Sequence, residues 1–190
     1  MESGFDESSI QCEDSRELVE ELALQKALAI NENDVLVIGG DTVVSLDGEI
    51  LGKAHSEGEA REILNKLIGK SHEVVTGIAV VNVLTGERVV GSAVGRVRLR
   101  DVSGVELEKY IQDGHWRGFA GCYAIQGKAK KWVMEQSGVF SAIIGMPIGL
   151  TVQLLEEMGV VVEIDPEQVE QEIIGEKVGL STQGGSAFGG

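Results

Sequence analysis

The chain has 190 residues, 43% hydrophobic and 25% charged, values typical of one globular domain with a substantial core. Its formal net charge of −15 argues against nonspecific binding to nucleic acid, which requires a basic surface that releases counterions. Because it has neither a bilayer-spanning apolar stretch nor the basic start and apolar run of a signal peptide, we expect a cytoplasmic protein without nucleic-acid or membrane partners.

The first predicted element is a helix that begins after residue 14. Asp14 is suited to be its N-cap, with Glu17 three residues later as the capping-box partner. Apolar residues then recur at helical spacing and form one buried stripe: Val19, Leu22, Ala23, Ala27 and Ile30. Lys26 lies at the edge of this stripe, so its ammonium group can lean into a neighbouring cleft.

A strand and a hairpin are predicted next. Residues 35–38 form a short apolar run typical of a strand buried on both faces, and Gly39-Gly40-Asp41 is expected to end it. Asp47-Gly48 supplies the positive φ angles of a type I′ turn, which predicts a hairpin. Such a turn places Thr42 opposite Lys53 and returns this lysine to the neighbourhood of Asp41, on a face that depends on the register.

The remainder of the chain alternates between helical and strand patterns. Ser56 and Glu59 form a capping box before a second helix, which Gly69 ends. The later predictions are strands at 73–76, 78–83, 89–90, 94–99, 122–126 and 160–164, helices at 105–112 and 148–158, and a glycine-rich loop at 113–121. This order indicates an α/β or α+β domain over residues 1–164, followed by a flexible tail over 165–190.

Three residues have the chemistry of a candidate phosphate site. Asp41 follows a predicted buried strand and two glycines, where a catalytic carboxylate has room, although the local pattern alone favours a residue that caps a turn. Lys26 and Lys53 carry ammonium groups that suit phosphate oxygens, but most lysines are solvated surface charges. The functional interpretation therefore depends on whether both lysines meet Asp41 in space.

Two further polar residues admit alternative interpretations. Gln126 follows a predicted strand and precedes a glycine, where its amide can contact a base or orient a water, or simply belong to a turn. His72 precedes a strand, and a hydrogen-bonded structural histidine is favoured over a general base. From the residues alone, the chain is an acidic α/β protein with a candidate carboxylate–lysine site.

Six segments of the chain together resemble the Maf family of nucleoside-triphosphate pyrophosphatases. They follow one another in the order and at about the spacing of that family, from residue 5 to about residue 164. The segments are Leu22-Ala23-Leu24-Gln25-Lys26-Ala27, Val37-Ile38-Gly39-Gly40-Asp41-Thr42-Val43-Val44, Ile50-Leu51-Gly52-Lys53, Gly69-Lys70-Ser71-His72-Glu73-Val74-Val75-Thr76-Gly77, Ala120-Gly121-Cys122-Tyr123-Ala124-Ile125-Gln126-Gly127 and Ile144-Gly145-Met146-Pro147-Ile148.

This resemblance implies a fold, a reaction and a set of site residues. The fold is an elongated, two-lobed α/β structure with a mixed sheet around a central cleft, similar to the inosine-triphosphate pyrophosphatases. The reaction is the hydrolysis of non-canonical or dTTP- and UTP-like triphosphates to monophosphate and pyrophosphate, with Mg²⁺ or Mn²⁺ as cofactor. The resemblance implies that Asp41 and Glu7 bind the metal. It implies catalytic roles for Asp41, Lys26 and Lys53. The two lysines also match phosphate-binding positions, and Gln126 matches a nucleotide-binding position.

The resemblance also implies a biological role and shows one departure. House-cleaning of nucleotide pools and septum formation are associated with the family, and a homodimer is a family-level expectation. Family members open with a Ser-x-Ser-Pro-Arg-Arg loop that binds phosphate, and nothing like it precedes Glu7. Loss of such donors is expected to reduce activity by about 10² or more. The alternative is a catalytically impaired relative that binds nucleotides or regulates division.

Overall fold

The computed structural model describes residues 10, 12–30, 32 and 35–178. Its centre is a five-stranded sheet in the order β2-β1-β3-β4-β5, in which all four pairs of neighbouring strands are antiparallel. The strands are β1 (Leu36–Leu46), β2 (Glu49–Leu51), β3 (Ser71–Asn82), β4 (Arg88–Leu99) and β5 (Val133–Gly138). The α/β class is confirmed, although the strands of the described residues do not form the mixed sheet that the family resemblance implied.

Two tight turns connect the strands, and the first of them is the turn that the sequence predicts. Asp47 and Gly48 have φ angles of 51° and 89°, as a type I′ turn requires, and Val44 pairs with Leu51 in the predicted register. The Thr85-Gly86 turn joins β3 to β4, with Gly86 at a φ of 74°. The strands β1 and β2 therefore form one hairpin and β3 and β4 form a second, and a helix connects the two hairpins.

The strands are longer than the local pattern indicated. The prediction that Gly39-Gly40-Asp41 ends a strand is wrong, because β1 continues through this segment and pairs with β3 from Leu36 to Ser45. The predicted burial on both faces is also wrong, since Leu36 and Ile38 are 36% and 43% exposed. A long antiparallel partner supplies backbone hydrogen bonds across the glycines, so they do not interrupt the strand.

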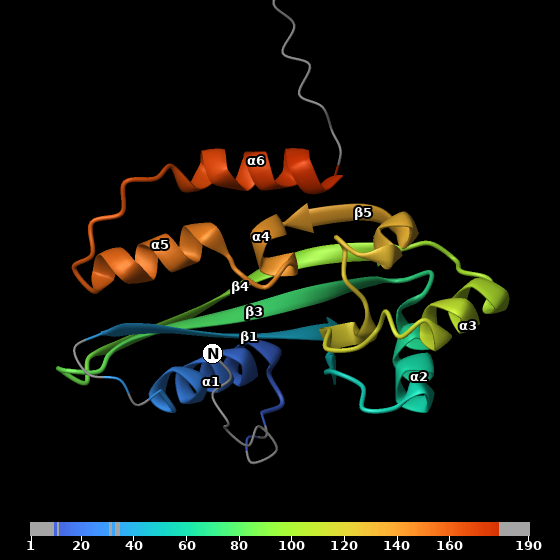
Figure 1. Cartoon of the computed structure of the whole chain (residues 1–190), viewed down its shortest axis with the longest axis horizontal. Coiled ribbons are helices and arrows are strands. Elements are labelled where there is room, and N and C mark those ends of the chain that lie inside the picture. The colour runs from blue at the N-terminus through green and yellow to red at the C-terminus, as the bar shows by residue number, and fades with distance from the viewer. Residues whose placement is uncertain (1–9, 11, 31, 33–34, 179–190) are drawn as a thin grey trace, which may run out of the picture.

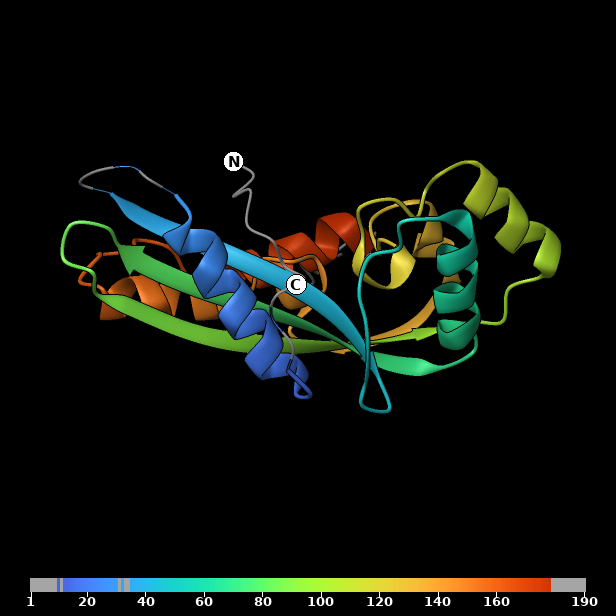
Figure 2. The ribbon, with the colours of Figure 1, turned by 90° about the horizontal axis from the view of Figure 1, so that it is seen from below.

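The described residues form six α-helices, which lie around the sheet (Figure 1). The helix α1 covers one face, whereas α4, α5 and α6 lie over the opposite face, and α2 and α3 lie at one end (Figures 1 and 2). Their bounds are α1 (Ser15–Leu28), α2 (Glu57–Leu67), α3 (Gly104–Gln112), α4 (Phe140–Ile143), α5 (Ile148–Glu157) and α6 (Pro166–Val178). Among the described residues, no helix combines the length and the apolar composition needed to cross a bilayer.

The predicted helix starts are confirmed at two positions. The Asp14 carboxylate accepts hydrogen bonds from the backbone N–H groups of Arg16 and Glu17, at 2.8 and 3.1 Å. The Ser56 hydroxyl accepts one from the N–H of Glu59 at 3.2 Å. Both caps satisfy N–H groups that have no partner within the first turn of a helix.

The segments after residue 120 differ most from the sequence predictions. Residue 122 ends the short 3₁₀ helix η2 (Ala120–Cys122), residues 123–126 form an irregular segment and the start of a turn, and residues 160–164 form no strand, so both predicted strands are wrong. The fifth strand is instead β5, which follows the 3₁₀ helix η3 (Lys128–Trp132). Within the predicted flexible tail, residues 166–178 form α6, because Ile173 and Ile174 pack against the main core.

The apolar core is divided between two lobes. The larger cluster packs β2 and one end of the long strands against α2, α3 and the 3₁₀ helices, with Trp132, Leu64 and Ile111 fully buried. Smaller clusters lie on both faces of the other end of the sheet, under α1 and α5. The two lobes share the long strands, so residues in the middle of β1 lie between them.

Candidate active site

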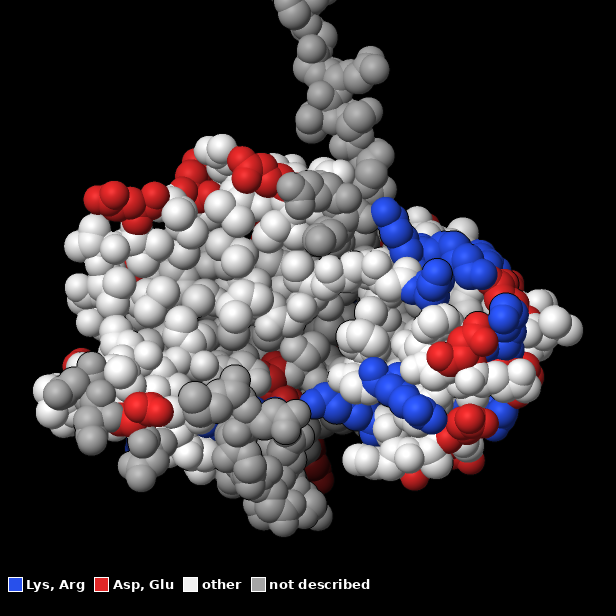
Figure 3. Space-filling model, viewed as in Figure 1, with Lys and Arg blue, Asp and Glu red and all other residues white. Residues whose placement is uncertain are grey.

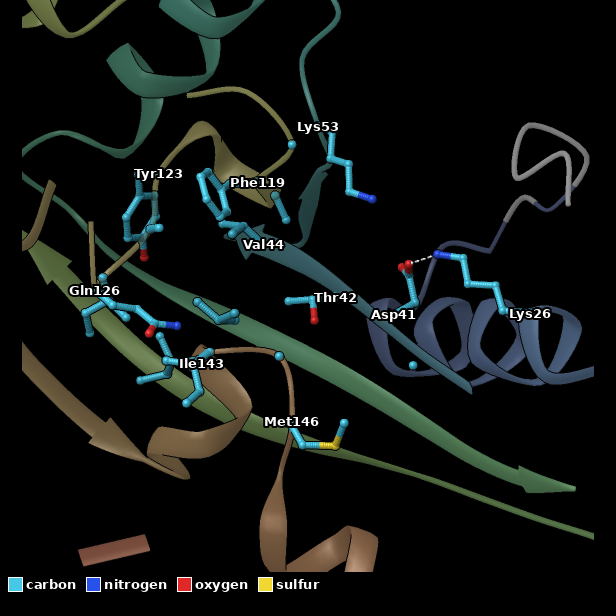
Figure 4. Close-up of a pocket in the computed structure, with 18 residues that line it drawn as sticks. Lys26, Asp41, Thr42, Val44, Lys53, Phe119, Tyr123, Gln126, Ile143 and Met146 are labelled. Carbon is cyan, nitrogen blue, oxygen red and sulfur yellow. Dashed lines mark hydrogen bonds and ion pairs between the residues drawn. The ribbon is translucent and has the colours of Figure 1, made fainter. Parts of the chain in front are cut away.

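A cleft of about 440 Å³ lies between the lobes. Its walls come from six parts of the chain: the end of α1, the middle of β1, the segment after β2, Val74 of β3, and two segments around residues 118–126 and 143–146. Figure 4 shows the charged side chains at one end of this cleft and aromatic, amide and aliphatic side chains at the other. It therefore has one polar end and one mostly apolar end.

Asp41 and Lys26 form the charged end. Asp41 lies within β1 opposite Gly77 of β3, and its carboxylate Oδ1 accepts a hydrogen bond from the ammonium Nζ of Lys26 as an ion pair. Both side chains are largely buried, at 7% and 17% exposed. Burial lowers the effective dielectric around these charges, so they act more strongly on a ligand than surface charges do.

Two glycines bring Lys26 to this position. A Cβ atom at Gly39 would lie 2.1 Å from the carbonyl oxygen of Ala23, and one at Gly77 would lie 2.3 Å from that of Val19. The α1 backbone therefore rests directly on the sheet at these two residues. This close packing holds the last turns of α1, and with them Lys26, beside Asp41.

Lys53 enters the cleft from another element. It follows β2, and its side chain points toward the Asp41–Lys26 pair (Figure 4). Its segment is held in place because the N–H of Gly121 donates a 3.0 Å hydrogen bond to the carbonyl of Gly52. The fold thus brings Lys26, Asp41 and Lys53 together in one cleft. Their functional interpretation required this proximity.

Gln126 lines the opposite end of the cleft, where its amide points inward (Figure 4). The neighbouring Tyr123 is buried and its hydroxyl lies 2.7 Å from Nε2 of His72. Burial lowers the pKa of His72 to about 4, so its ring is neutral near pH 7. His72 is therefore a hydrogen-bonded core residue behind the cleft wall, as the favoured interpretation states.

The residues that line the cleft have a different charge balance from the whole chain. Among these residues of the described chain, Asp41 is the one carboxylate, and it is accompanied by the cations of Lys26 and Lys53. Figure 3 shows basic side chains, with acidic ones among them, gathered on the lobe that carries α2 and α3. An anionic ligand in the cleft is therefore met by local positive charge in spite of the net charge of −15.

A divalent metal ion is compatible with this arrangement in one specific way. The described residues contain no group of three or more histidine, cysteine, aspartate or glutamate side chains that could hold a metal ion by themselves. Mg²⁺, however, is commonly held by one or two carboxylates together with substrate phosphates. The Asp41 carboxylate meets that requirement, whereas Glu7 lies outside the described residues.

One lining residue, Thr42, belongs to a hydrogen-bond network that has no signal in the sequence. The hydroxyl of Thr42 lies 2.8 Å from that of Thr76, which donates to the carbonyl of Ala142, also at 2.8 Å. This chain of contacts ties β1 and β3 to α4 and hence to the loop at residues 143–146. Sequence spacing gives no means of finding it, because residues 42, 76 and 142 meet only in the folded sheet.

Two residues of the glycine-rich loop, Trp116 and Arg117, do not line the cleft. Trp116 is 4% exposed and its indole N–H donates a 3.1 Å hydrogen bond to the carbonyl of Ile111. It therefore packs in the core and does not line the cleft. The Arg117 guanidinium lies over the Trp116 ring, 5.3 Å from its centroid, and lines a neighbouring cavity.

Comparison with known proteins gives a consistent set of similarities. Residues 1–158 match the model of the family described as Maf-like protein. A dTTP/UTP pyrophosphatase of Symbiobacterium thermophilum is 37% identical over 156 residues, which cover 81% of this chain and 79% of the relative. Its counterpart in Hyphomonas neptunium is 38% identical over 82% of this chain and 81% of the relative. That of Pyrococcus abyssi is 40% identical over 72% and 73%.

Proposed function

The chain belongs to the family of Maf-like proteins, and from this premise we propose that it hydrolyses dTTP- and UTP-like triphosphates to nucleoside monophosphate and pyrophosphate. The observation that carries the proposal is the meeting of Lys26, Asp41 and Lys53 in one cleft. Relatives that are 37% and 38% identical are named dTTP/UTP pyrophosphatases. The chain is thus an enzyme of nucleotide metabolism.

The two ends of the cleft suit the two ends of a nucleotide. Lys26 and Lys53 offer compact ammonium groups to the phosphates, whose charge increases on the leaving pyrophosphate as the reaction proceeds. Gln126 lies at the other end, where an amide can form hydrogen bonds with the nucleotide. In this orientation the α-phosphate lies nearest the middle of the cleft, between the base and the charged residues.

We assign Asp41 and Glu7 to the divalent cation, Mg²⁺ or Mn²⁺, that the family implies. The bound cation would neutralise phosphate charge and polarise a phosphoryl oxygen. Asp41 contributes a rigidly mounted carboxylate from the middle of β1, and its ion pair with Lys26 fixes the orientation of that carboxylate. The division of roles between metal ligand and general base is left open between Asp41 and Glu7.

The reaction needs one water molecule and no other reactant. The water oxygen forms a bond to the α-phosphorus, and the bond from that phosphorus to the bridging oxygen of the β-phosphate breaks. Pyrophosphate leaves with the electron pair, and the proton of the water passes to a carboxylate or to solvent. Lys26 and Lys53 stabilise the negative charge that accumulates on the departing group.

The direct test is pyrophosphate release from a panel of nucleoside triphosphates with Mg²⁺ or Mn²⁺. We expect release from dTTP or UTP, and we expect Asp41→Asn to reduce it at least about 10²-fold because the variant removes the carboxylate but preserves its shape. Asp113→Asn serves as the matched control, since Asp113 is an exposed residue outside the cleft. Circular dichroism verifies that both variants are folded.

The same panel separates the alternative function. Nucleotides that raise the melting temperature without any pyrophosphate release would reject the enzyme and indicate a nucleotide-binding relative. Equal activity of Asp41→Asn and Asp113→Asn would reject the assigned role of Asp41. Homodimerisation and a cytoplasmic location remain predictions from the family resemblance and the sequence.

A further inference from the structure

A second cavity adjoins the apolar end of the cleft. It has a volume of about 540 Å³, and its own walls include His115, Arg117 and Lys128. Three residues line both spaces: Phe119, Ala124 and Gln126. Of these three, Phe119 has the largest side chain, so its ring is the main partition between the two cavities.

The Phe119 ring is exposed for an aromatic residue, because 44% of its surface is accessible. Its backbone, in contrast, is held on both sides. The preceding Gly118 has a φ of 81°, and the carbonyl of Phe119 accepts a 3.1 Å hydrogen bond from the N–H of Cys122. Through Gly121, the same turn is bonded to Gly52 beside Lys53, so the ring stands at a fixed place relative to the phosphate end.

The surroundings of the ring suit a flat, partly polar ligand. Ile143 and Met146 lie on the opposite side of the cleft, and the Gln126 amide lies at its end (Figure 4). An aromatic ring facing aliphatic side chains, with one amide at the edge, is a suitable slot for a heterocyclic base. An edge-to-face contact between a base and an aromatic side chain strengthens binding roughly two- to tenfold.

We propose that Phe119 is a specificity-determining residue whose ring meets the edge of the base and closes the slot to bases larger than a pyrimidine. The proposal rests on the function proposed above and adds the source of its base selectivity. A single-ring base ends at the Phe119 partition, whereas the second ring of a purine would need the space that Phe119 closes off. Removal of the ring joins the cleft to the second cavity.

Calorimetric binding to Phe119→Ala, Phe119→Tyr and the wild-type chain tests this proposal. The probes are non-hydrolysable α,β-imido analogues of dTTP and dATP, and inorganic tripolyphosphate, which has no base. Met134→Ala is the matched control, because Met134 is 59% exposed on β5 and lines neither cavity. Melting temperatures establish that each variant is folded.

The expected result has three parts. Phe119→Ala weakens binding of the dTTP analogue about five-fold and narrows the ratio between the affinities for the dTTP and dATP analogues. Tripolyphosphate binding stays within two-fold of the wild type, roughly the scatter expected where no contact is lost. Phe119→Tyr, which retains an aromatic ring, and Met134→Ala keep the wild-type ratio.

Other outcomes would overturn the proposal. An equal loss for the dTTP analogue and tripolyphosphate would mean that Phe119 affects the whole cleft and not the base. If Phe119→Ala left the ratio between the affinities for the two analogues unchanged, the role of Phe119 as a partition that excludes purines would be rejected. Because the probes report binding without turnover, a chain that binds selectively but releases no pyrophosphate contradicts the proposed function and leaves this inference standing.

Discussion

Two lysines of this chain form ion pairs of very different burial. Lys26 pairs with the buried Asp41, whereas Lys66 pairs with Glu49, and the side chains of that second pair are 45% and 55% exposed. An exposed pair is screened by water and salt, and it contributes below about 1 kcal/mol to stability. The same residue types therefore differ in consequence because of where the fold places them.

Substitution of these lysines tests that difference. We predict that Lys26→Gln lowers pyrophosphatase activity about 10²-fold or more, because a charge-stabilising donor is lost from a preorganised site. Lys66→Gln is the matched control and should leave activity unchanged. Steady-state kinetics on both variants provide the measurement, and comparable activity in the two would contradict the role given to Lys26.

His72 predicts a specific pH dependence of stability. Burial lowers its pKa from 6.5 to about 4 in the folded chain, so the unfolded chain binds a proton more readily between these values. The contribution of neutral His72 to the free energy of unfolding is therefore fully present above pH 6.5. It is lost as the pH falls toward 4, and amounts to about 3 kcal/mol in total.

Urea unfolding of the wild type and His72→Gln between pH 7.5 and 4.5 measures this contribution. Carboxylates titrate in both proteins, so the difference between their free energies of unfolding isolates the histidine. We expect the advantage of the wild type over the variant to shrink as the pH falls. A difference that does not change with pH would show that His72 keeps an ordinary pKa.

At the scale of elements, the contact between α1 and the sheet controls the site. We predict that Gly39→Ala destabilises the chain by a few kcal/mol, because its Cβ would lie 2.1 Å from the Ala23 carbonyl and α1 must move. Activity should fall with it, since α1 carries Lys26. Gly58→Ala in α2 is the control, with no contact closer than 3.8 Å and an expected gain of roughly 0.5–1 kcal/mol.

Thermal unfolding and kinetics together test the Gly39 prediction. A folded Gly39→Ala variant with reduced activity would show that the position of α1, and not only its presence, is required. A variant with wild-type stability and activity would show that the backbone contact can relax without displacing Lys26.

The local signals that sequence analysis reads explain which elements were predictable. Asp14 and Ser56 cap helices through residues within three positions, so α1 and α2 were found at their starts. The extent of β1 depends instead on β3, its partner from 71 to 82, and no window around Gly39-Gly40 contains that partner. The edge strand β5 carries no run of alternating apolar residues and was missed.

The candidate site shows the same division. Composition and spacing indicated Asp41, Lys26 and Lys53 as separate candidates, and the family resemblance joined them before the structure brought them into one cleft. Phe119 had no signal, because an aromatic residue in a glycine-rich loop is compatible with many roles. Its position on the wall of two cavities arises from the turn at residues 118–122, whose geometry depends on contacts with Gly52 and Val44.

At the scale of the whole molecule, global and local electrostatics act in opposite directions. The chain carries 31 acidic and 16 basic residues, so like-charge repulsion opposes the folded state. The cleft, in contrast, presents Lys26 and Lys53 to an anionic ligand. Salt screens both effects, with a Debye length that falls from about 30 Å at 0.01 M to about 10 Å at 0.1 M.

We therefore predict that sodium chloride raises the melting temperature of the ligand-free chain while it weakens nucleotide binding. Thermal unfolding and calorimetry with the non-hydrolysable dTTP analogue, at constant Mg²⁺, measure the two quantities over the same salt range. Lys53→Gln should show a weaker dependence of affinity on salt, because one of the attracting charges is absent, and Lys66→Gln serves as its control. If salt strengthened binding, repulsion by the net charge would outweigh the cleft lysines, and the charge argument for an anionic ligand would fail.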